Sequence, residues 1–231
     1  MTWPEEKEIT TDLAKGDRAM ACPFHICLRI LSLLKRFPPR FLLFLVRNPY
    51  NETMNPWKDI DSSRISPEKF LAYIEISKGS KNKYELDKES GLLKLDRILY
   101  TSTQYPQNYG FIPKTYAEDH DPLDVLVITS ETILPMTLVD CKPIGMIDMI
   151  DQGARDVKIL AVCPNDPFYS GYDSIDQLPS HIVTEIQFFF ETYKVLEGKE
   201  TLVPGLQGRD EALKVIAESI ERYKDRIQGR R

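Results

Sequence analysis

The chain has 231 residues, of which 42% are hydrophobic and 10% aromatic, enough apolar material for one sizeable core. Its net charge at pH 7 is −5, so no overall positive field attracts it to nucleic acid or anionic membranes. The four cysteines and three histidines have none of the spacings of a zinc site, and no GxxxxGK[ST] loop occurs. These features argue against a disulfide-stapled module, a zinc enzyme and a nucleotide-dependent P-loop protein.

Residues 1–53 differ in composition from the remainder. They hold eight Lys/Arg and six Asp/Glu, so the net charge of −5 leaves −7 for the rest of the chain. Their longest uninterrupted apolar run, residues 41–46, is far too short for a transmembrane helix. We expect a poorly ordered N-terminal extension that is either a targeting segment or a leader ahead of a native start at Met54. Residues 54–231 then form the main domain, in which the motifs described below lie.

Beyond Met54 the pattern predicts short strands followed by helices. The strands cover residues 70–76, 83–86, 92–99, 125–129, 144–150 and 157–163. Two helices cover residues 180–196 and 210–227, and their apolar stripes indicate a face that packs on the strands. Closely spaced short strands favour a small barrel, so the expected fold class is mainly β with two C-terminal flanking helices.

The most informative segment is the acidic loop, residues 119–124, with the sequence Asp-His-Asp-Pro-Leu-Asp. Three carboxylates so close together repel one another unless a cation lies between them. Oxygen-only ligands favour hard divalent cations over zinc. An Asp-rich surface turn is the simpler alternative. An EF-hand is excluded, because positions six and twelve counted from Asp119 are Asp124 and Ser130 rather than Gly and Glu.

A second acidic segment begins at Asp151 and includes Asp156. Together with Asp119 and Asp124, these residues could surround two or more cations from neighbouring loops. Paired metal ions are a recurring arrangement in phosphoryl hydrolysis.

Residues suited to binding an anion occur in the same part of the sequence. They lie in the segments 83–85 (Lys-Tyr-Glu), 105–110 (Tyr-Pro-Gln-Asn-Tyr-Gly) and 193–194 (Tyr-Lys). Each segment alone is better explained by an ordinary half-buried tyrosine or a solvated lysine.

The order of these motifs resembles that of the family I soluble inorganic pyrophosphatases. The resemblance extends from about residue 55 to 195 and centres on the acidic loop, which matches the family signature D-x-D-P-x-D. It is supported by residues 73–76, 83–87, 96–97, 105–110 and 193–194.

The resemblance implies a closed, OB-like barrel of five strands with flanking helices, and hydrolysis of pyrophosphate to two phosphates with two or more Mg²⁺ ions per site. By position, Asp119, Asp124 and Asp156 correspond to ligands of the principal metals, and Asp151 with Glu85 to ligands of metals arriving with substrate. Asp121 corresponds to the general base. The implied phosphate contacts are Lys83, Arg97, Tyr109, Lys158, Tyr193 and Lys194, Tyr109 also counting as catalytic, and Glu75 and Tyr105 line the same cavity.

Some positions depart from the family pattern. Gln152, Ala154 and Val157 stand where many relatives carry acidic residues, which implies weaker binding of the outer metals. Phe188 and Thr192 replace the paired histidines of bacterial members, so a hexamer held by those histidines is not expected, and the homo-oligomeric state stays open.

The alternatives from other classes are an OB-type nucleic-acid-binding module and a cation-binding protein without catalysis. The first lacks a basic groove, and neither explains the order of acidic and basic residues. The expected partner is pyrophosphate, with no nucleic acid or membrane. The expected location is cytoplasmic, unless the N-terminal extension directs import into an organelle.

Overall fold

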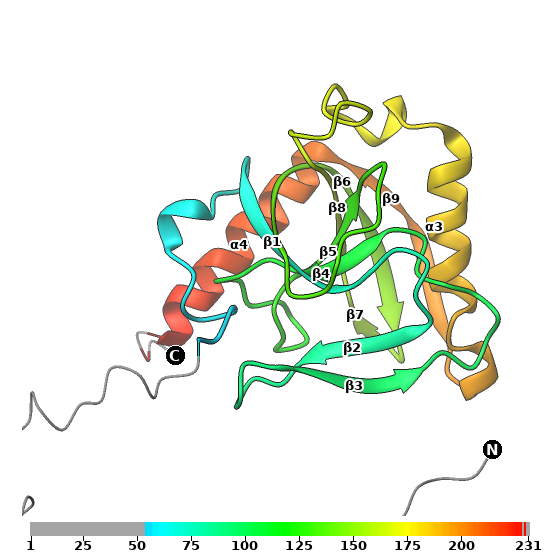
Figure 1. Ribbon diagram of the computed structural model, residues 1–231, viewed down its shortest axis with the longest axis horizontal. Helices are drawn as coiled ribbons and strands as arrows, with labels where there is room; N and C mark the ends of the chain where they lie inside the picture. Colours follow the sequence, from blue (N-terminus) through cyan, green and yellow to red (C-terminus); the bar gives the residue numbers. More distant parts are fainter. Residues whose placement is uncertain (1–53, 228, 230–231) are drawn as a thin grey trace, which may run out of the picture. The chain divides into compact units, whose positions relative to one another are not determined.

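The computed structural model describes residues 54–227 and 229, so the expectations for residues 1–53 lie outside the described part of the chain. In Figure 1 the strands lie between two helices, with a separate hairpin beneath them. The strands are β1 Phe70–Ile76, β2 Asn82–Leu86, β3 Leu93–Ile98, β4 Asn108–Phe111, β5 Asp124–Ile128, β6 Leu138–Asp151, β7 Ala154–Arg155, β8 Lys158–Val162 and β9 Thr201–Gly208. The helices are α3 Ser180–Thr192 and α4 Arg209–Ile227, with short 3₁₀ turns η1 Ser62–Arg64, η2 Ile175–Gln177 and η3 Val195–Glu197.

Five strands form a closed ring. The order is β1-β4-β5-β8-β6, and β6 also pairs with β1. Neighbours in the ring are antiparallel except β5 and β8, which run parallel. Closing the ring removes the exposed strand edges that an open sheet would leave. The predicted fold class, mainly β with two C-terminal helices around a five-stranded core, is therefore confirmed.

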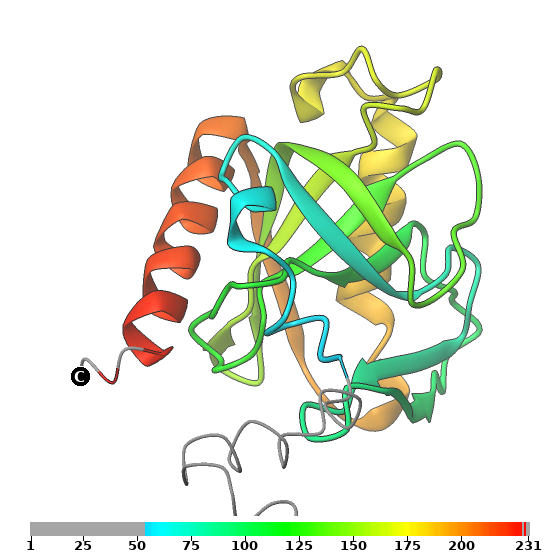
Figure 2. The same cartoon turned by 60° about the vertical axis from the view of Figure 1, so that its left-hand side comes forward.

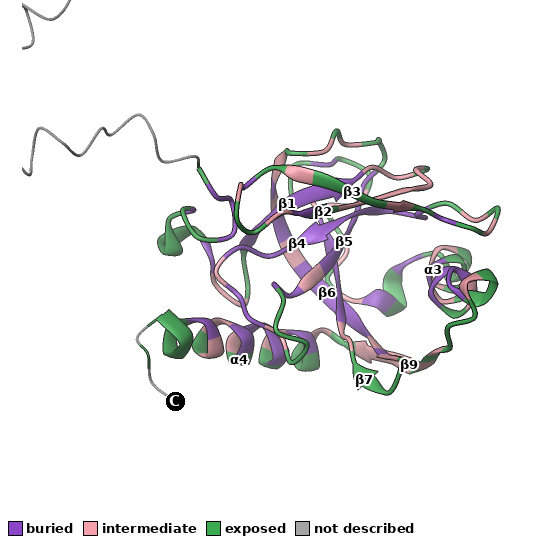
Figure 3. Cartoon of the chain, turned by 90° about the horizontal axis from the view of Figure 1, so that it is seen from below, coloured by how far each residue is buried: buried purple, intermediate pink, exposed green. Residues whose placement is uncertain are grey.

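Strand β5 shows how alternation distributes the core. Val125 and Val127 face a cluster that includes Ala212 and Ile216 of α4. Leu126 and Ile128 face a second cluster that contains buried residues of α3. Because both faces of β5 are covered, its sequence is a continuous apolar run rather than an alternating one. Figure 2 shows α3 and α4 on different sides of the strands, and in Figure 3 α4 has buried positions interspersed with exposed ones along its length.

Strands β2 and β3 form a separate two-stranded sheet with its own register. Leu86 and Leu93 pack against a third cluster that contains Trp57 and Phe111, and this contact attaches the hairpin to the ring. Leu95 and Ile98 share the face of Leu93 in the hairpin register but are exposed, so this face is covered only near Leu86 and Leu93. This element carries several of the predicted site residues.

The structure also corrects details of the predicted elements. Helix α3 ends at Thr192 rather than at residue 196, and η3 follows before Gly198 takes a left-handed backbone with φ of 67°. Strand β4 was not predicted because it has four residues, including Gly110. Strand β9 was not predicted because Pro204 and glycines occupy it, and these residues are rare inside strands.

Gly110 is required by the close approach of β4 to β1. A Cβ atom at this position would lie 1.9 Å from the carbonyl oxygen of Tyr73. We expect Gly110→Ala to lower the free energy of unfolding by about 3 kcal/mol, because the clash involves backbone on both sides. Denaturant unfolding measures this, with Gly205→Ala as the control, since its Cβ would meet nothing within 4 Å. Equal stability of the two variants would contradict the assigned pairing of β1 and β4.

Candidate active site

The site is built where strands β5 and β8 begin and strand β6 ends. In the parallel pair, Asp124 lies opposite Lys158 in register, as the first residue of each strand. Asp151 is the last residue of β6. Asp156 lies just before β8, and its N–H donates to the carbonyl of Met149 at 2.8 Å. Strand pairing therefore brings acidic residues that are distant in sequence to one end of the ring.

Lys158 is the central cation of this end. It is 3% exposed, and its Nζ donates to Asp124 Oδ2 and, at 2.5 Å, to Asp156 Oδ1. Burial alone would lower the pKa of Lys158, but the carboxylates of Asp124 and Asp156 raise it well above its usual value. Burial raises the pKa of Asp156, and the Lys158 ammonium opposes that change. One buried positive charge is thus shared by two carboxylates.

Buried tyrosines lie beside Lys158 and its carboxylate partners. Tyr109 of β4 donates its hydroxyl to Asp124 Oδ2 at 2.6 Å. Tyr105 packs against Tyr109 with ring centroids 5.2 Å apart. Burial raises the pKa of Tyr109 and Tyr193 well above the ordinary value for a phenol. Both phenols therefore stay protonated and can donate hydrogen bonds at neutral pH.

The acidic loop is shaped by its own backbone contacts. The N–H of Asp121 donates to Asp119 Oδ1 at 3.1 Å, and the N–H of Ala117 donates to the carbonyl of Asp121 at 2.7 Å. His120 between them has φ of 73°, an uncommon left-handed conformation for a non-glycine residue. At the end of the loop, the N–H of Leu123 donates to a buried threonine hydroxyl, so the loop enters β5 in a fixed position.

The β2–β3 hairpin brings further charges to the site. The ammonium of Lys83 pairs with Glu85 and, at 3.1 Å, with Asp96. Burial alone would lower the pKa of Lys83, but these two carboxylates raise it. Lys88, just past β2, pairs with Asp121 of the acidic loop. The hairpin thus supplies two cations to the lining of the cavity.

Helix α3 contributes through the residues that follow its last turn. Lys194 is 8% exposed, and its Nζ pairs with Asp151 Oδ2. Burial lowers the pKa of Lys194, although Asp151 partly offsets the change. The other oxygen of Asp151, Oδ1, is buried without a hydrogen-bond partner in the described structure. A buried carboxylate oxygen in this state is suited to a cation, since such groups are costly when unpaired.

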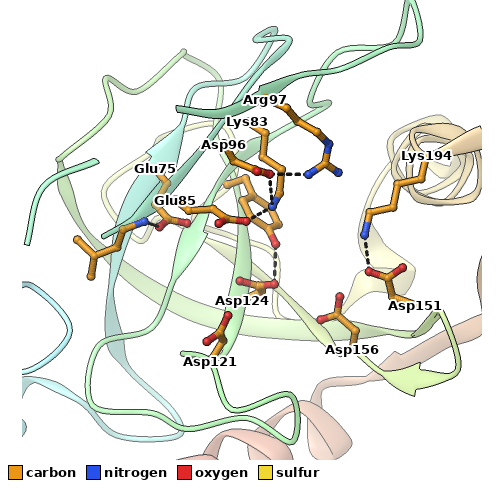
Figure 4. A network of polar contacts seen from close by, with 12 residues as sticks. Glu75, Lys83, Glu85, Asp96, Arg97, Asp121, Asp124, Asp151, Asp156 and Lys194 are labelled. Atoms are coloured by element: carbon orange, nitrogen blue, oxygen red, sulfur yellow. Dashed lines mark hydrogen bonds and ion pairs between the residues drawn. The ribbon is translucent and has the colours of Figure 1, made fainter. Parts of the chain in front are cut away.

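Almost all predicted site residues line one cavity of about 280 Å³. Figure 4 shows side chains from the strands, the hairpin and the segment after α3 directed into the same region. The predicted residues that line it are Glu75, Lys83, Glu85, Tyr105, Tyr109, Asp119, Asp121, Asp124, Asp151, Asp156, Lys158, Tyr193 and Lys194.

Arg97 differs from this group. Its guanidinium lies outside the lining of the cavity, where Nε donates to Glu197 at 2.8 Å and Nη1 to Asp96. Glu197 is 7% exposed at its side chain, so this ion pair is largely removed from solvent. The pair joins β3 to the segment that follows α3.

Three residues of the network were not predicted as site residues: Lys88, Asp96 and Glu197. Lys88 follows directly after the predicted 83–87 motif, so extending that motif by one residue would have included it. Asp96 is the sequence neighbour of the predicted Arg97, so its position beside that residue is the signal that could have indicated it. Glu197 contacts a residue 100 positions away, and no pattern in the sequence indicates that contact.

The donor set fits hard cations, although the carboxylates now contact ammonium groups. Within residues 54–227 and 229, no three Asp, Glu, His or Cys side chains are grouped closely enough to hold one ion together. The physical reason is that Lys158 lies between Asp124 and Asp156, and Lys194 contacts Asp151. The oxygen donors around the cavity, including the unpaired Oδ1 of Asp151, suit Mg²⁺ better than a soft metal.

Comparison with known proteins decides the family. The family model described as inorganic pyrophosphatase matches residues 72–224. The chain belongs to this family. It is 49% identical to soluble inorganic pyrophosphatase 2 of Chlamydomonas reinhardtii over 177 residues, which cover 77% of the chain and 92% of that protein. It is 50% identical to soluble inorganic pyrophosphatase PPA1 of Solanum tuberosum, over 75% of the chain and 82% of that protein.

A solved structure agrees with the sequence relatives. The inorganic pyrophosphatase from Thermus thermophilus superposes with a TM-score of 0.70 at 40% identity, covering 73% of this chain and 99% of that one. The resemblance to family I soluble inorganic pyrophosphatases is thus confirmed, and the chain is an enzyme of that class. The alternatives of a nucleic-acid-binding module and a non-catalytic cation-binding protein are set aside. Among the described residues, no helix has the length and apolarity needed to cross a membrane.

Glu75 provides a test of the charge balance in the cavity. Burial raises the pKa of Glu75 from 4.5 to about 8, with Asp124 adding to the shift. A raised folded-state pKa means that the contribution to stability is complete below 4.5 and is lost as pH rises toward 8. In chelating buffer, we expect wild-type stability to fall relative to Glu75→Gln by roughly 1 kcal/mol per pH unit in that window.

Denaturant unfolding at several pH values measures the difference. The control is Glu68→Gln, which alters an exposed carboxylate and should follow the wild type at every pH. A constant difference between wild type and Glu75→Gln would mean that Glu75 does not titrate in this window.

Proposed function

We propose that this pyrophosphatase hydrolyses inorganic pyrophosphate to two phosphates with Mg²⁺, and that Asp121 is the general base. The observation that carries the proposal is one cavity in which carboxylates of the acidic loop and of β6–β8 face lysines and tyrosines. Pyrophosphate is a small polyanion, so it needs cations on several sides, and water that attacks it needs a proton acceptor.

In this mechanism Asp119, Asp124 and Asp156 would hold the principal metal ions. Asp151 and Glu85 would hold metal ions that accompany the substrate. Bound Mg²⁺ neutralises negative charge on pyrophosphate and lowers the pKa of water at the site. Spreading the carboxylates over several segments suits Mg²⁺, which takes few protein ligands per ion.

Asp121 is suited to the role of base by its position. Its side chain is 55% exposed in a segment that lines the cavity, and Lys88 contacts Oδ1. Oδ2 is therefore the oxygen that can accept the proton of the attacking water. The backbone hydrogen bond from Asp121 to Asp119 keeps the base next to a proposed metal ligand.

The cationic and phenolic side chains bind the two phosphoryl groups. Lys83 of β2 and Lys194 after α3 both line the cavity, and Tyr193 can donate a hydrogen bond there. Tyr109 can donate to phosphate once its hydroxyl leaves Asp124. Their charges and hydrogen bonds stabilise the leaving phosphate as it gains negative charge. Arg97 takes part in this binding if its guanidinium turns from Glu197 toward the cavity. Cytoplasmic location and homo-oligomerisation stay predictions.

The role of Asp121 can be tested by substitution. We expect Asp121→Asn to lower kcat by about 10²–10⁴-fold, because the amide cannot accept the proton from water. We expect Asp124→Asn also to raise the Mg²⁺ concentration needed for half-maximal activity, since it removes a metal ligand. Phosphate release from pyrophosphate measures both effects. Asp140→Asn is the control, because this half-exposed β6 carboxylate has only a 4.0 Å contact with Lys69 and lies outside the cavity lining.

The outcome that would contradict this assignment is a kcat for Asp121→Asn equal to that of Asp140→Asn. A change in Mg²⁺ dependence alone, with kcat preserved, would make Asp121 a metal ligand rather than the base.

Metal dependence has its own test. We expect removal of divalent cations by a chelator to abolish phosphate release and added Mg²⁺ to restore it. Ca²⁺ should suppress the Mg²⁺-supported rate, because it is larger and less strictly octahedral and so misplaces the reacting groups. Full activity in the chelator would rule out the proposed mechanism.

A further inference from the structure

Helix α4 contributes none of the described residues that line the cavity, yet it holds the segment from which the acidic loop starts. Tyr116 lies three residues before Asp119. Its N–H donates to the carbonyl of Ser219 at 2.9 Å, and its carbonyl accepts from Arg222 Nε at 2.9 Å. Both backbone polar groups of Tyr116 are therefore bound by one turn of α4.

The guanidinium of Arg222 is itself fixed. Its Nη2 donates to Ser219 Oγ at 2.9 Å, and Ser219 is fully buried. The planar group thus bridges the helix and the loop with two directed hydrogen bonds. A charged donor makes a stronger hydrogen bond to a carbonyl than a neutral one, and the fork geometry of arginine fixes its direction.

The side chain of Tyr116 continues this connection into the acidic loop. Its ring stacks on the ring of His120, with centroids 5.6 Å apart and an interplanar angle of 26°. Arg226 of α4 lies over the same phenol ring, 4.4 Å from its centroid, and donates to its hydroxyl. His120 separates Asp119 from Asp121 and has the uncommon φ of 73°, so its conformation determines where both carboxylates point.

We propose that Arg222 is a positioning residue for metal binding and catalysis: through Tyr116 it holds the acidic loop in the conformation that presents Asp119 and Asp121 to the cavity. This inference rests on the proposed Mg²⁺-dependent function. A loop with a left-handed His120 pays a conformational cost, which contacts at its base must offset. The hydrogen bonds from α4 supply that constraint from outside the cavity.

The test compares Arg222→Met, which keeps the length of the side chain but removes its donors, with Arg222→Lys, which keeps one charged donor. Lys214→Met is the matched control, because Lys214 lies on α4 and pairs with Glu211 of the same helix. Three quantities are measured: Mg²⁺ affinity by calorimetry without substrate, kcat and KM at saturating Mg²⁺, and hydrogen exchange of peptides that cover residues 117–123.

We expect Arg222→Met to weaken Mg²⁺ affinity about tenfold, the loss expected for a hydrogen bond from a charged group, and to speed exchange in residues 117–123. KM for pyrophosphate should change less than kcat, because the lysines that bind substrate are on other elements. Arg222→Lys should recover part of the affinity, and Lys214→Met should match the wild type. A residue that only stabilised the fold would lower the unfolding midpoint and leave Mg²⁺ affinity unchanged.

Ser219→Ala is a second variant, since it removes only the hydrogen bond from Arg222 Nη2 and keeps the backbone bond from Tyr116 to the carbonyl of residue 219. It should show a smaller shift in the same direction. The inference is overturned if Arg222→Met and Ser219→Ala fold and bind Mg²⁺ as the wild type does, or if exchange in residues 117–123 is unchanged. If the wild type neither binds Mg²⁺ nor releases phosphate, the proposed function has failed, and the proposed role of Arg222 in metal binding and catalysis is overturned with it. Hydrogen exchange then shows separately whether Arg222 still holds the loop.

Discussion

The site depends on one buried positive charge, the ammonium of Lys158, placed between Asp124 and Asp156 at the start of two parallel strands. A carboxylate pair at the end of a closed apolar ring would repel and resist burial without a cation. The β5–β8 register places Lys158 beside Asp124, and strand pairing therefore sets the electrostatics of the cavity. Removing one partner of a buried ion pair leaves the other charge uncompensated, which typically costs about 3–5 kcal/mol of stability.

Further charge pairs repeat this arrangement around the cavity from other elements. The hairpin supplies Lys83 and Lys88, and the segment after α3 supplies Lys194. Each ammonium contacts a carboxylate proposed to bind metal or to accept a proton. Carboxylates outnumber lysines in the lining of the cavity, so bound cations would offset the excess negative charge and would leave the lysines able to contact phosphate. Under the proposed function, such an exchange of partners would let one acidic cavity also bind an anion.

The sequence predicted the site better than it predicted the contacts within it. The carboxylates of the acidic loop were found because they lie in one short motif, and strands such as β5 because their apolar runs are continuous. Strand β4 was missed because it contains Gly110, a residue that is rare in strands. The reason for this glycine is the close approach of β4 to β1, which is visible only in the folded structure. The contacts of Arg97 with Glu197 and of Arg222 with Tyr116 join residues about a hundred positions apart, and local pattern cannot indicate them.

The claim that Asp124 of β5 and Asp156, just before β8, require a positive charge between them can be tested directly with Lys158→Met, an apolar replacement of similar length. The measurement is the unfolding midpoint with chelator and with Mg²⁺, for this variant and the wild type. The account predicts a large loss of stability in chelator and a greater gain on adding Mg²⁺ than the wild type shows, because the ion replaces the missing charge between Asp124 and Asp156. Equal gains in the two proteins would contradict it.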